Sequence, residues 1–349
     1  MLPIINIKGI HFKDGKRTFQ HIPKKGTLMN TCATMNEKYI CCRVHVLKSV
    51  HNCPFECSYC FLQNYLTDGT TKIVGDIDTL MEEVKSTIVQ EPERLFRIGT
   101  WELGDSLALE NASGQAARLI SEFAKLDNSV LELKTKSDRI DSILHADHGG
   151  RTIVSWSLNP QLIIEREERG TAPLEKRLAA MHKVCEAGFP VGLHFDPMIE
   201  HDGWQEGYRD LVTRIFKTVP PERVAWISMG SLRFNPEMKK KIENNYPDSM
   251  LTSAEMVLGD DAKMRYVKPL RIEMYKSLYG DLKKHITDTH LVYLCMERWD
   301  VWDRVFGHHP ESIGHLDYLF AKSMYERFGL GNQEPDPGTY AKSQITNSK

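Results

Sequence analysis

The sequence predicts an α/β protein built around a parallel sheet, and two observations support this fold class. Stretches rich in apolar and β-branched residues alternate with helix-like stretches from about residue 39 to residue 229. Such alternation requires right-handed crossovers, which place successive strands parallel to one another in one sheet. Beyond residue 230 helical patterns dominate, so we expect a mainly helical C-terminal extension.

The expected elements follow one another in a regular order. A first strand lies within residues 39–50, leads into a cysteine-rich loop, and is followed by one or two helical turns over residues 61–66. The later helices are expected at residues 78–89, 114–126, 140–145, 174–187 and 205–218. The strands after them are expected at residues 95–101, 130–135, 152–157, 191–195 and 223–229, which gives six β units. Further helices are expected at residues 236–245, 261–286 and 313–328, with a strand at residues 291–297.

Composition narrows the class of protein. Of the 349 residues, 41% are hydrophobic and 26% are charged, which is typical of a globular protein in water. The N-terminus has no signal pattern and no apolar run reaches the length of a membrane span, so we expect a cytoplasmic protein with no membrane partner. The net charge of −2 argues against bulk attraction to nucleic acid but allows a local basic groove.

The most informative stretch is the loop Cys53-Pro54-Phe55-Glu56-Cys57-Ser58-Tyr59-Cys60, which has the pattern C-x3-C-x2-C. Three thiolates can hold three irons of a [4Fe–4S] cluster, which leaves the fourth iron open to a small molecule. A zinc site would require a second pair of ligands at matching spacing, and no other CxxC occurs. Disulfides suit short secreted chains rather than this one. The loop therefore predicts an iron–sulfur cluster.

This spacing, with an aromatic residue before the last cysteine, resembles the signature of radical S-adenosylmethionine (SAM) enzymes. The resemblance implies two cofactors, the [4Fe–4S] cluster and SAM, and an electron donor such as flavodoxin or ferredoxin. In that family one electron cleaves SAM to give a 5′-deoxyadenosyl radical. The resemblance also implies a partial (β/α)6 barrel, which matches the six expected β units.

Several further stretches, in family order, resemble the spore photoproduct lyase family, whose members reverse a thymine dimer in spore DNA. They are residues 53–63, Glu102, and residues 135–141 (TKSDRID), 155–159 (SWSLN), 188–192 (GFPVG), 200–208, 232–236 (LRFNP) and 245–247 (NYP). The resemblance covers about residues 40–250. It implies a lyase that acts on a DNA pyrimidine photolesion, with damaged DNA as its partner.

The resemblance assigns roles to residues near the cluster. Cys53, Cys57 and Cys60 would hold the cluster, and Tyr59 would lie beside the bound SAM. Lys136, at the end of the third strand, would meet the SAM carboxylate. Without the resemblance, Lys136 would be interpreted as a solvated surface lysine.

Three more residues are candidates for binding SAM. Ser157 and Asn159, at the end of the fourth strand, could bind ribose or carboxylate oxygens, or could form a strand-ending turn. Asp196, at the end of the fifth strand, could reach the ribose or a substrate, or could cap the turn before Pro197.

One departure from the family bears on the reaction. The family's second strand runs Phe-Glu-Ala-Ala-Cys-Thr-Ser-Asp, and its cysteine gives a hydrogen atom to the repaired thymine radical. Here Asp105 stands in that place, and the tyrosine after the third cluster cysteine is Phe61. A carboxylate has no weak X–H bond to give, so the sequence predicts that the chain does not repair the lesion in the usual way. Tyr59 or Cys42 could serve as another donor, and the loop with Glu102 and Asp105 could contact a different substrate.

The chain is expected to divide into an N-terminal arm (1–37), the partial barrel (38–232), a helical or mixed extension (233–330) and a disordered tail (331–349). Two alternatives to the lyase function remain open. The chain could be a radical SAM enzyme with a different substrate and a different radical-quenching group. It could also be a catalytically silent nucleic-acid-binding relative, although such a protein would have no need for the three cysteines and Lys136.

Overall fold

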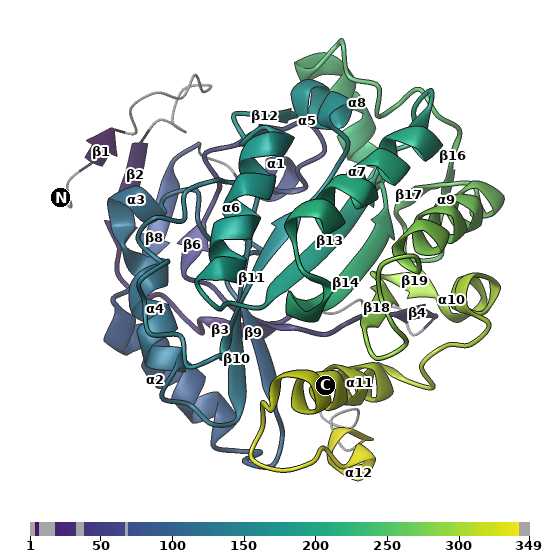
Figure 1. Ribbon diagram of the computed structural model, residues 1–349. Coiled ribbons are helices and arrows are strands. Elements are labelled where there is room, and N and C mark those ends of the chain that lie inside the picture. Colours follow the sequence, from purple (N-terminus) through teal and green to yellow (C-terminus); the bar gives the residue numbers. More distant parts are fainter. Residues whose placement is uncertain (1–3, 7–17, 33–37, 67–68, 342–349) are drawn as a thin grey trace.

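The computed structural model describes residues 4–6, 18–32, 38–66 and 69–341, and its centre is a curled eight-stranded sheet (Figure 1). All strands of this sheet run parallel except β3, which pairs antiparallel with β5. In sheet order the strands are β18 (Leu291–Leu294), β14 (Val224–Ser231), β13 (Val191–Met198), β11 (Thr152–Ser157), β10 (Ser129–Thr135), β9 (Phe96–Gly99), β5 (His45–Leu47) and β3 (Met29–Thr31).

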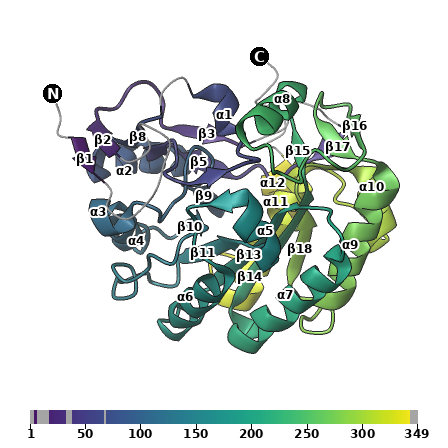
Figure 2. The ribbon, with the colours of Figure 1, turned by 90° about the horizontal axis from the view of Figure 1, so that it is seen from above.

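The six expected β units are confirmed, in the expected order, as β5, β9, β10, β11, β13 and β14. The sheet also takes in β3 and β18, so its edges lie outside the expected limits of residues 38 and 232. Figure 2 shows the strands following a curve from β5 to β18, with α6 (Leu174–Glu186), α7 (Trp204–Thr218) and α9 (Lys268–Leu282) along its outer side. The fold is thus a partial barrel with helices on its outer face.

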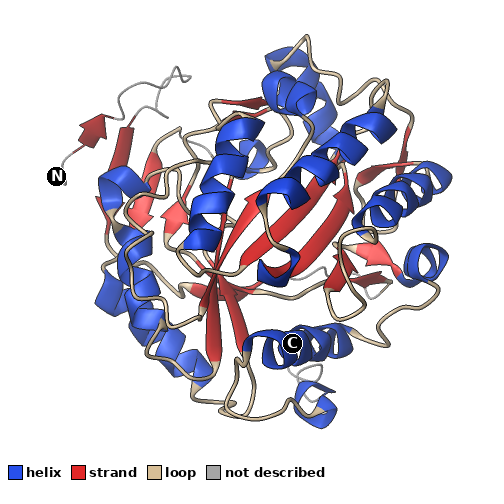
Figure 3. Ribbon diagram, viewed as in Figure 1, coloured by secondary structure: helices blue, strands red, loops and turns tan. Residues whose placement is uncertain are grey.

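The remaining helices lie around the sheet (Figure 3). They are α1 (Leu62–Tyr65), α2 (Ile77–Ile88), α3 (Glu110–Ser113), α4 (Gln115–Phe123), α5 (Gln161–Glu167), α8 (Pro236–Asn245), α10 (Trp299–Phe306), α11 (Ile313–Phe328) and α12 (Pro337–Ala341), with a 3-10 turn at Pro221–Arg223. Their local signals are clear in α2, where Asp76 accepts a hydrogen bond from the Thr79 N–H at the first turn. Leu80 and Val84 then lie on the buried face of that helix.

Three expected elements differ from the structure. Residues 140–145 form turns instead of a helix, because the Ile143 and Ala146 N–H groups bond to carbonyls three residues back and a single i to i+4 bond, from Leu144 to Ile140, stands between them. Of the helix expected over 261–286, only α9 (Lys268–Leu282) forms, and Pro269 lies in its first turn, where proline is favoured. The strand expected over 291–297 divides into β18 and β19 (Glu297–Arg298) at Met296, whose φ of 52° breaks the extended chain.

The expected N-terminal arm is wrong for its described part. Of its residues, β3 joins the main sheet, while β1 (Ile4–Asn6) and β2 (Thr18–Ile22) form a second sheet with β8 (Thr71–Val74) and β6 (Val50–His51). These short strands gain their hydrogen bonds from distant partners, so local pattern did not indicate them. Residues 7–17 and 33–37 lie outside the described residues.

The expected disordered tail is also wrong up to residue 341. Tyr340 in α12 is 1% exposed, and its hydroxyl accepts a hydrogen bond from the Leu95 N–H at 3.0 Å. This anchor holds the segment against the amino end of β9. Residues 342–349 lie outside the described residues.

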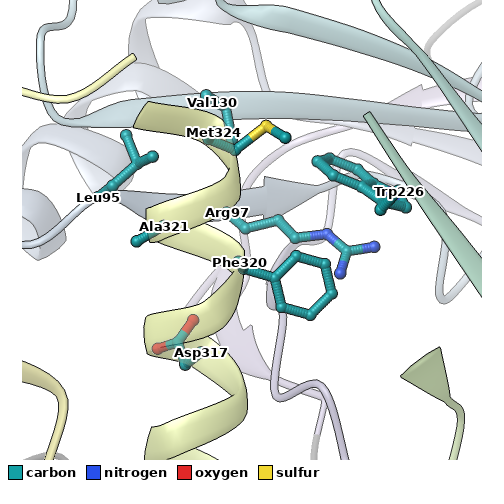
Figure 4. Close-up of a pocket in the computed structure, with 8 residues that line it drawn as sticks. All are labelled: Leu95, Arg97, Val130, Trp226, Asp317, Phe320, Ala321 and Met324. Atoms are coloured by element: carbon teal, nitrogen blue, oxygen red, sulfur yellow. The ribbon is translucent and has the colours of Figure 1, made fainter. Parts of the chain in front are cut away.

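Helix α11 closes the barrel at the amino ends of its strands (Figure 4). There the Arg97 guanidinium lies between the rings of Trp226 and Phe320, at 4.2 and 4.4 Å from their centroids. Arg97 also pairs with the buried Glu132 on β10, which in turn contacts His194 on β13. The barrel interior is therefore filled at this end, and the site must lie at the other end. No helix within the described part of the chain is long and apolar enough to cross a membrane.

Candidate active site at the carboxyl ends of the strands

The cysteine-rich loop lies between β6 and α1, and the backbone holds it in a fixed path. At its start Asn52 has a left-handed conformation, with φ of 70°. The side chain of Asn52 accepts a hydrogen bond from the Cys53 N–H and donates one to the Gly69 carbonyl. Inside the loop, β7 (Glu56–Cys57) pairs antiparallel with β12 (Glu168–Arg169). The loop is thus fixed at its entrance and at its second cysteine.

The three motif cysteines come together. Cys53, Cys57 and Cys60 all pack against the same small apolar cluster, formed with Phe55 and Ala108. Burial raises the pKa of Cys57 to about 12, and the neighbouring Cys60 thiol adds to that rise. A cationic iron cluster would supply the positive charge that such buried thiolates need.

The donor set suits a cluster better than a single ion. Among the described residues, no three His, Cys, Asp or Glu side chains are arranged around one metal ion. In a [4Fe–4S] cluster each cysteine binds a different iron, so three ligand thiols need not converge on one point. The loop therefore fits the cofactor that the sequence predicts.

Lys136 lies at this site rather than on the surface. It follows β10 directly, and its ammonium is 5.5 Å from the centre of the Tyr59 ring. Burial alone would lower the pKa of Lys136, but nearby Cys57 and Glu168 raise it above its ordinary value. A charged ammonium beside the cysteine loop is suited to binding a carboxylate.

Glu168 is the central polar residue of the site, and the sequence did not indicate it. Its carboxylate accepts hydrogen bonds from the Tyr59 hydroxyl, from the Asn159 amide at 3.0 Å and from Arg177 at 2.6 Å. The side chains of Glu168 and Arg177 are completely buried. The Asn159 carbonyl oxygen also accepts from the Tyr208 hydroxyl at 2.8 Å, so Asn159 positions Glu168. Glu168 therefore fixes the orientation of the Tyr59 ring.

The preceding residue, Glu167, supports the loop from the other side. Its carboxylate accepts hydrogen bonds from the Ser58 and Ser249 hydroxyls and from the Met250 N–H. Its carbonyl accepts from the Ser58 N–H at 2.9 Å. Neither glutamate has a sequence signal, because residues 165–169 read Glu-Arg-Glu-Glu-Arg and indicate an exposed helix face.

Asp105 has a clear structural role in the loop after β9. One carboxylate oxygen accepts from the Leu107 and Ala108 N–H groups and the Thr135 hydroxyl, and the other accepts from the Lys136 N–H. Four donors thus occupy this carboxylate, which ties the loop to the end of β10. Glu102 in the same loop is half-buried and makes no side-chain hydrogen bond to other described residues.

Of the last two candidates, Ser157 is joined to Glu168 through Arg177, whereas Asp196 lies elsewhere at the strand ends. Ser157 is 3% exposed, and its carbonyl accepts from Arg177 at 2.8 Å. Asp196 instead pairs with Arg233 through both oxygens, at 3.0 and 3.3 Å. The structure therefore places Tyr59, Lys136 and Asn159 in one group and Asp196 in another.

Comparisons with known proteins identify a family. The family model for spore photoproduct lyase matches residues 45–295. The chain is 29% identical over 238 residues to the spore photoproduct lyase of Bacillus subtilis (strain 168), covering 67% of each chain. It is 25% identical over 247 residues to that of Geobacillus sp. (strain Y412MC61), covering 70% of each chain.

Solved structures agree at the level of the fold. A spore photoproduct lyase complexed with dinucleoside spore photoproduct matches with a TM-score of 0.71 and 20% identity, over 83% of this chain and 88% of that one. A variant of such a lyase with bound AdoMet and the same dinucleoside matches with a TM-score of 0.69 and 22% identity, again over 83% and 88% of the two chains. The family match covers well over half of the sequence, so this chain is a radical SAM protein and belongs to the spore photoproduct lyase family.

Proposed function

We propose that this chain holds a [4Fe–4S] cluster through Cys53, Cys57 and Cys60 and binds SAM beside it. The observation that carries the proposal is the packing of these three thiols against one apolar cluster, with the Lys136 ammonium next to Cys57. When bound and reduced by one electron, these cofactors supply a 5′-deoxyadenosyl radical. The electron would come from a low-potential donor such as flavodoxin or ferredoxin.

The residues of the chain would bind and orient SAM. Lys136 would pair with the methionine carboxylate, because its charge faces the cysteine loop. Tyr59, held by Glu168, would present its ring to the cofactor in one fixed orientation. Ser157 and Asp196 remain candidates for the ribose hydroxyls, and both Asp196 oxygens already accept from Arg233.

The proposed substrate is a DNA pyrimidine photolesion. The names of the relatives support this class, and so do the residues at the strand ends. The Trp101 ring lies 4.7 Å from the Lys134 ammonium, a combination of aromatic face and cation that suits a base and a phosphate. Asp105, in place of the family's cysteine, favours a second candidate: the same radical chemistry on another substrate. Both candidates require a group other than Asp105 to quench the substrate radical.

Anaerobic reconstitution with iron and sulfide tests the proposal. The protein should gain four irons per chain and, with SAM and a strong reductant, form 5′-deoxyadenosine. Cys57→Ala should lose both the iron and the product, whereas Cys185→Ala, on helix α6, should keep both. Iron content that is unchanged in Cys57→Ala would show that the cluster assignment is wrong. Adding dinucleoside spore photoproduct then tests the substrate separately.

A further inference from the structure

Four cysteines outside the motif gather where the barrel closes. Strand β4 (Tyr39–Ile40), just before β5, pairs antiparallel with β19, just after β18, and so joins the two ends of the parallel sheet (Figure 1). This closure brings Cys41 and Cys42 near Cys295, because the antiparallel pairing of Ile40 with Glu297 continues toward these residues. Cys41 also contacts the Cys32 carbonyl at 3.6 Å. The thiol group therefore lies at a junction of the barrel wall.

Of the thiols at this junction, Cys32 and Cys295 are partly exposed, and Cys295 faces the barrel interior. Tyr293 on β18 faces the barrel interior, because its hydroxyl accepts a hydrogen bond from Arg97 on β9. Strands β18 and β9 are not neighbours in the sheet, so this bond crosses the inside of the barrel. Alternate residues of a strand share a face, so Cys295 faces the same way at the carboxyl end of β18. Cys41 and Cys42 are only 1% and 5% exposed, whereas Cys295 is partly exposed.

A charged pair holds the Cys295 side chain in place. Arg233 donates a hydrogen bond to the Cys295 sulfur at 3.3 Å while it pairs with Asp196. Gly230 leaves the space that this pair needs, because a Cβ there would lie 2.6 Å from an Asp196 oxygen. The site thus contains a positioned thiol, a cation and a carboxylate from three different strand ends.

The surroundings keep this thiol in its S–H form. Burial raises the pKa of Cys295 well above its ordinary value, and the nearby Asp196 carboxylate adds to the rise. The Trp101 indole N–H donates to Glu132, which pairs with Arg97, and Arg97 donates to Tyr293, so Trp101 faces the same barrel interior as Tyr293 and Cys295. A substrate base stacked on Trp101 would therefore meet a protonated thiol across that space.

We propose that Cys295 donates the hydrogen atom that quenches the substrate radical in this chain. The inference rests on the proposed radical function. It names a residue for the quenching step, which Asp105 cannot perform, since four N–H and O–H groups already donate hydrogen bonds to its carboxylate. In the step, a C–H bond forms on the substrate as the S–H bond of Cys295 breaks, which leaves a thiyl radical. One electron from the low-potential donor that the reaction already requires, with one proton from water, restores the thiol.

The first test does not depend on turnover. The whole protein is alkylated by iodoacetamide at alkaline pH, because the raised pKa of Cys295 leaves little reactive thiolate near neutral pH. Mass spectrometry, site by site, should then find Cys295 modified, and dinucleoside spore photoproduct should slow that modification. Cys185, which is buried on helix α6 and also has a raised pKa, is the control, and its rate of reaction should be the same with and without the dinucleoside. If the dinucleoside slows neither thiol, Cys295 does not line the substrate site, whatever the turnover assay gives.

The second test uses reconstituted enzyme with SAM in heavy water, where the S–H group becomes S–D. The unmodified chain should place deuterium in the repaired thymine. In Cys295→Ser, which keeps the size and the contact with Arg233, the ratio of repaired product to 5′-deoxyadenosine should fall at least about tenfold, because a serine O–H bond is too strong to give its hydrogen atom. Cys185→Ala should leave this ratio unchanged.

The outcomes separate the two proposals. Equal repair and equal deuterium content in the unmodified chain and in Cys295→Ser would overturn the role of Cys295 and leave the radical function standing. Formation of 5′-deoxyadenosine without any repair by the unmodified chain would overturn the lesion as substrate, and with it Cys295 as the donor to thymine. Absence of 5′-deoxyadenosine in fully loaded protein would overturn the radical function itself.

Discussion

Replacing Arg177 by alanine tests how the fold holds the cysteine loop. Arg177 is fully buried and donates to Glu168, to the Thr171 hydroxyl and to the carbonyls of Ser157 and Ala172, all within 2.8 Å. Its loss leaves the Glu168 carboxylate buried without its cation. Breaking a buried ion pair from one side costs about 3–5 kcal/mol. We therefore expect Arg177→Ala to lower the free energy of unfolding by about that amount.

Urea unfolding under anaerobic conditions measures this loss, and iron content after reconstitution measures its effect on the site. Because Glu168 pairs with Cys57 in the β7–β12 register, iron occupancy should fall together with stability. Arg169→Ala is the matched control, since Arg169 is exposed and its guanidinium lies 5.0 Å from the Tyr246 ring. That control should stay within about 1 kcal/mol of the unmodified chain.

A double variant, Arg177→Met with Glu168→Gln, checks the cause of the loss. It removes the cation and also the uncompensated charge, so it should recover part of the stability that Arg177→Ala loses. The reasoning fails if Arg177→Ala unfolds like the Arg169→Ala control. It also fails if the double variant is less stable than Arg177→Ala, because the buried charge would then not be the source of the cost.

Three further predictions concern the site and the barrel. Lys136→Ala should weaken SAM binding by about tenfold to a hundredfold, through loss of a charge-assisted contact, while iron content stays constant; equilibrium binding of SAM to reconstituted protein measures this. Asp105→Cys should lower the free energy of unfolding by about 2–4 kcal/mol, because it removes the acceptor for four hydrogen-bond donors. Asp105→Asn should lower it by less. Equal stability of Asp105→Cys and the unmodified chain would contradict the role of this carboxylate. Burial, with help from Arg94 and Arg43, lowers the pKa of His45 in the folded chain from 6.5 to about 3. As the pH drops below 6.5, His45 therefore becomes protonated in the unfolded chain but not in the folded chain, and the free energy of unfolding falls. His45→Gln should reduce that slope by up to about 1.4 kcal/mol per pH unit between about pH 6 and 4.5, and an unchanged slope in urea unfolding would refute the assignment.

The six β units could be predicted because each has its own local pattern. In β10, for example, Leu131 and Leu133 face the outer helices while Glu132 and Lys134 face the interior, and that alternation is visible in the sequence. The cysteine loop was equally local, with three ligands in eight residues. Signals of this kind need no knowledge of distant partners.

The supports of the site could not be predicted because they depend on distant pairs. Strand β12 has two residues and no periodicity, and Glu168 pairs with Cys57, far away in the chain. The strand at residues 291–294 was expected, but its sequence does not say which sheet it joins. A missing cysteine at position 105 was visible, whereas the hydrogen bonds that hold Asp105 were not.

The hydrogen bonds of Asp105 explain why replacing this residue by cysteine would not by itself restore the family's chemistry. A cysteine there would gain a weak S–H bond, but the loop after β9 and the backbone of Lys136 would lose their shared acceptor. Lys136 is the proposed partner of the SAM carboxylate, so the same change that supplies a hydrogen donor would disturb the proposed cofactor site. A donor just after β18 avoids this conflict, because Cys295 accepts a hydrogen bond from Arg233 and shares none with Asp105 or Lys136. The carboxylate at position 105 and a thiol at the barrel closure are therefore compatible in one enzyme.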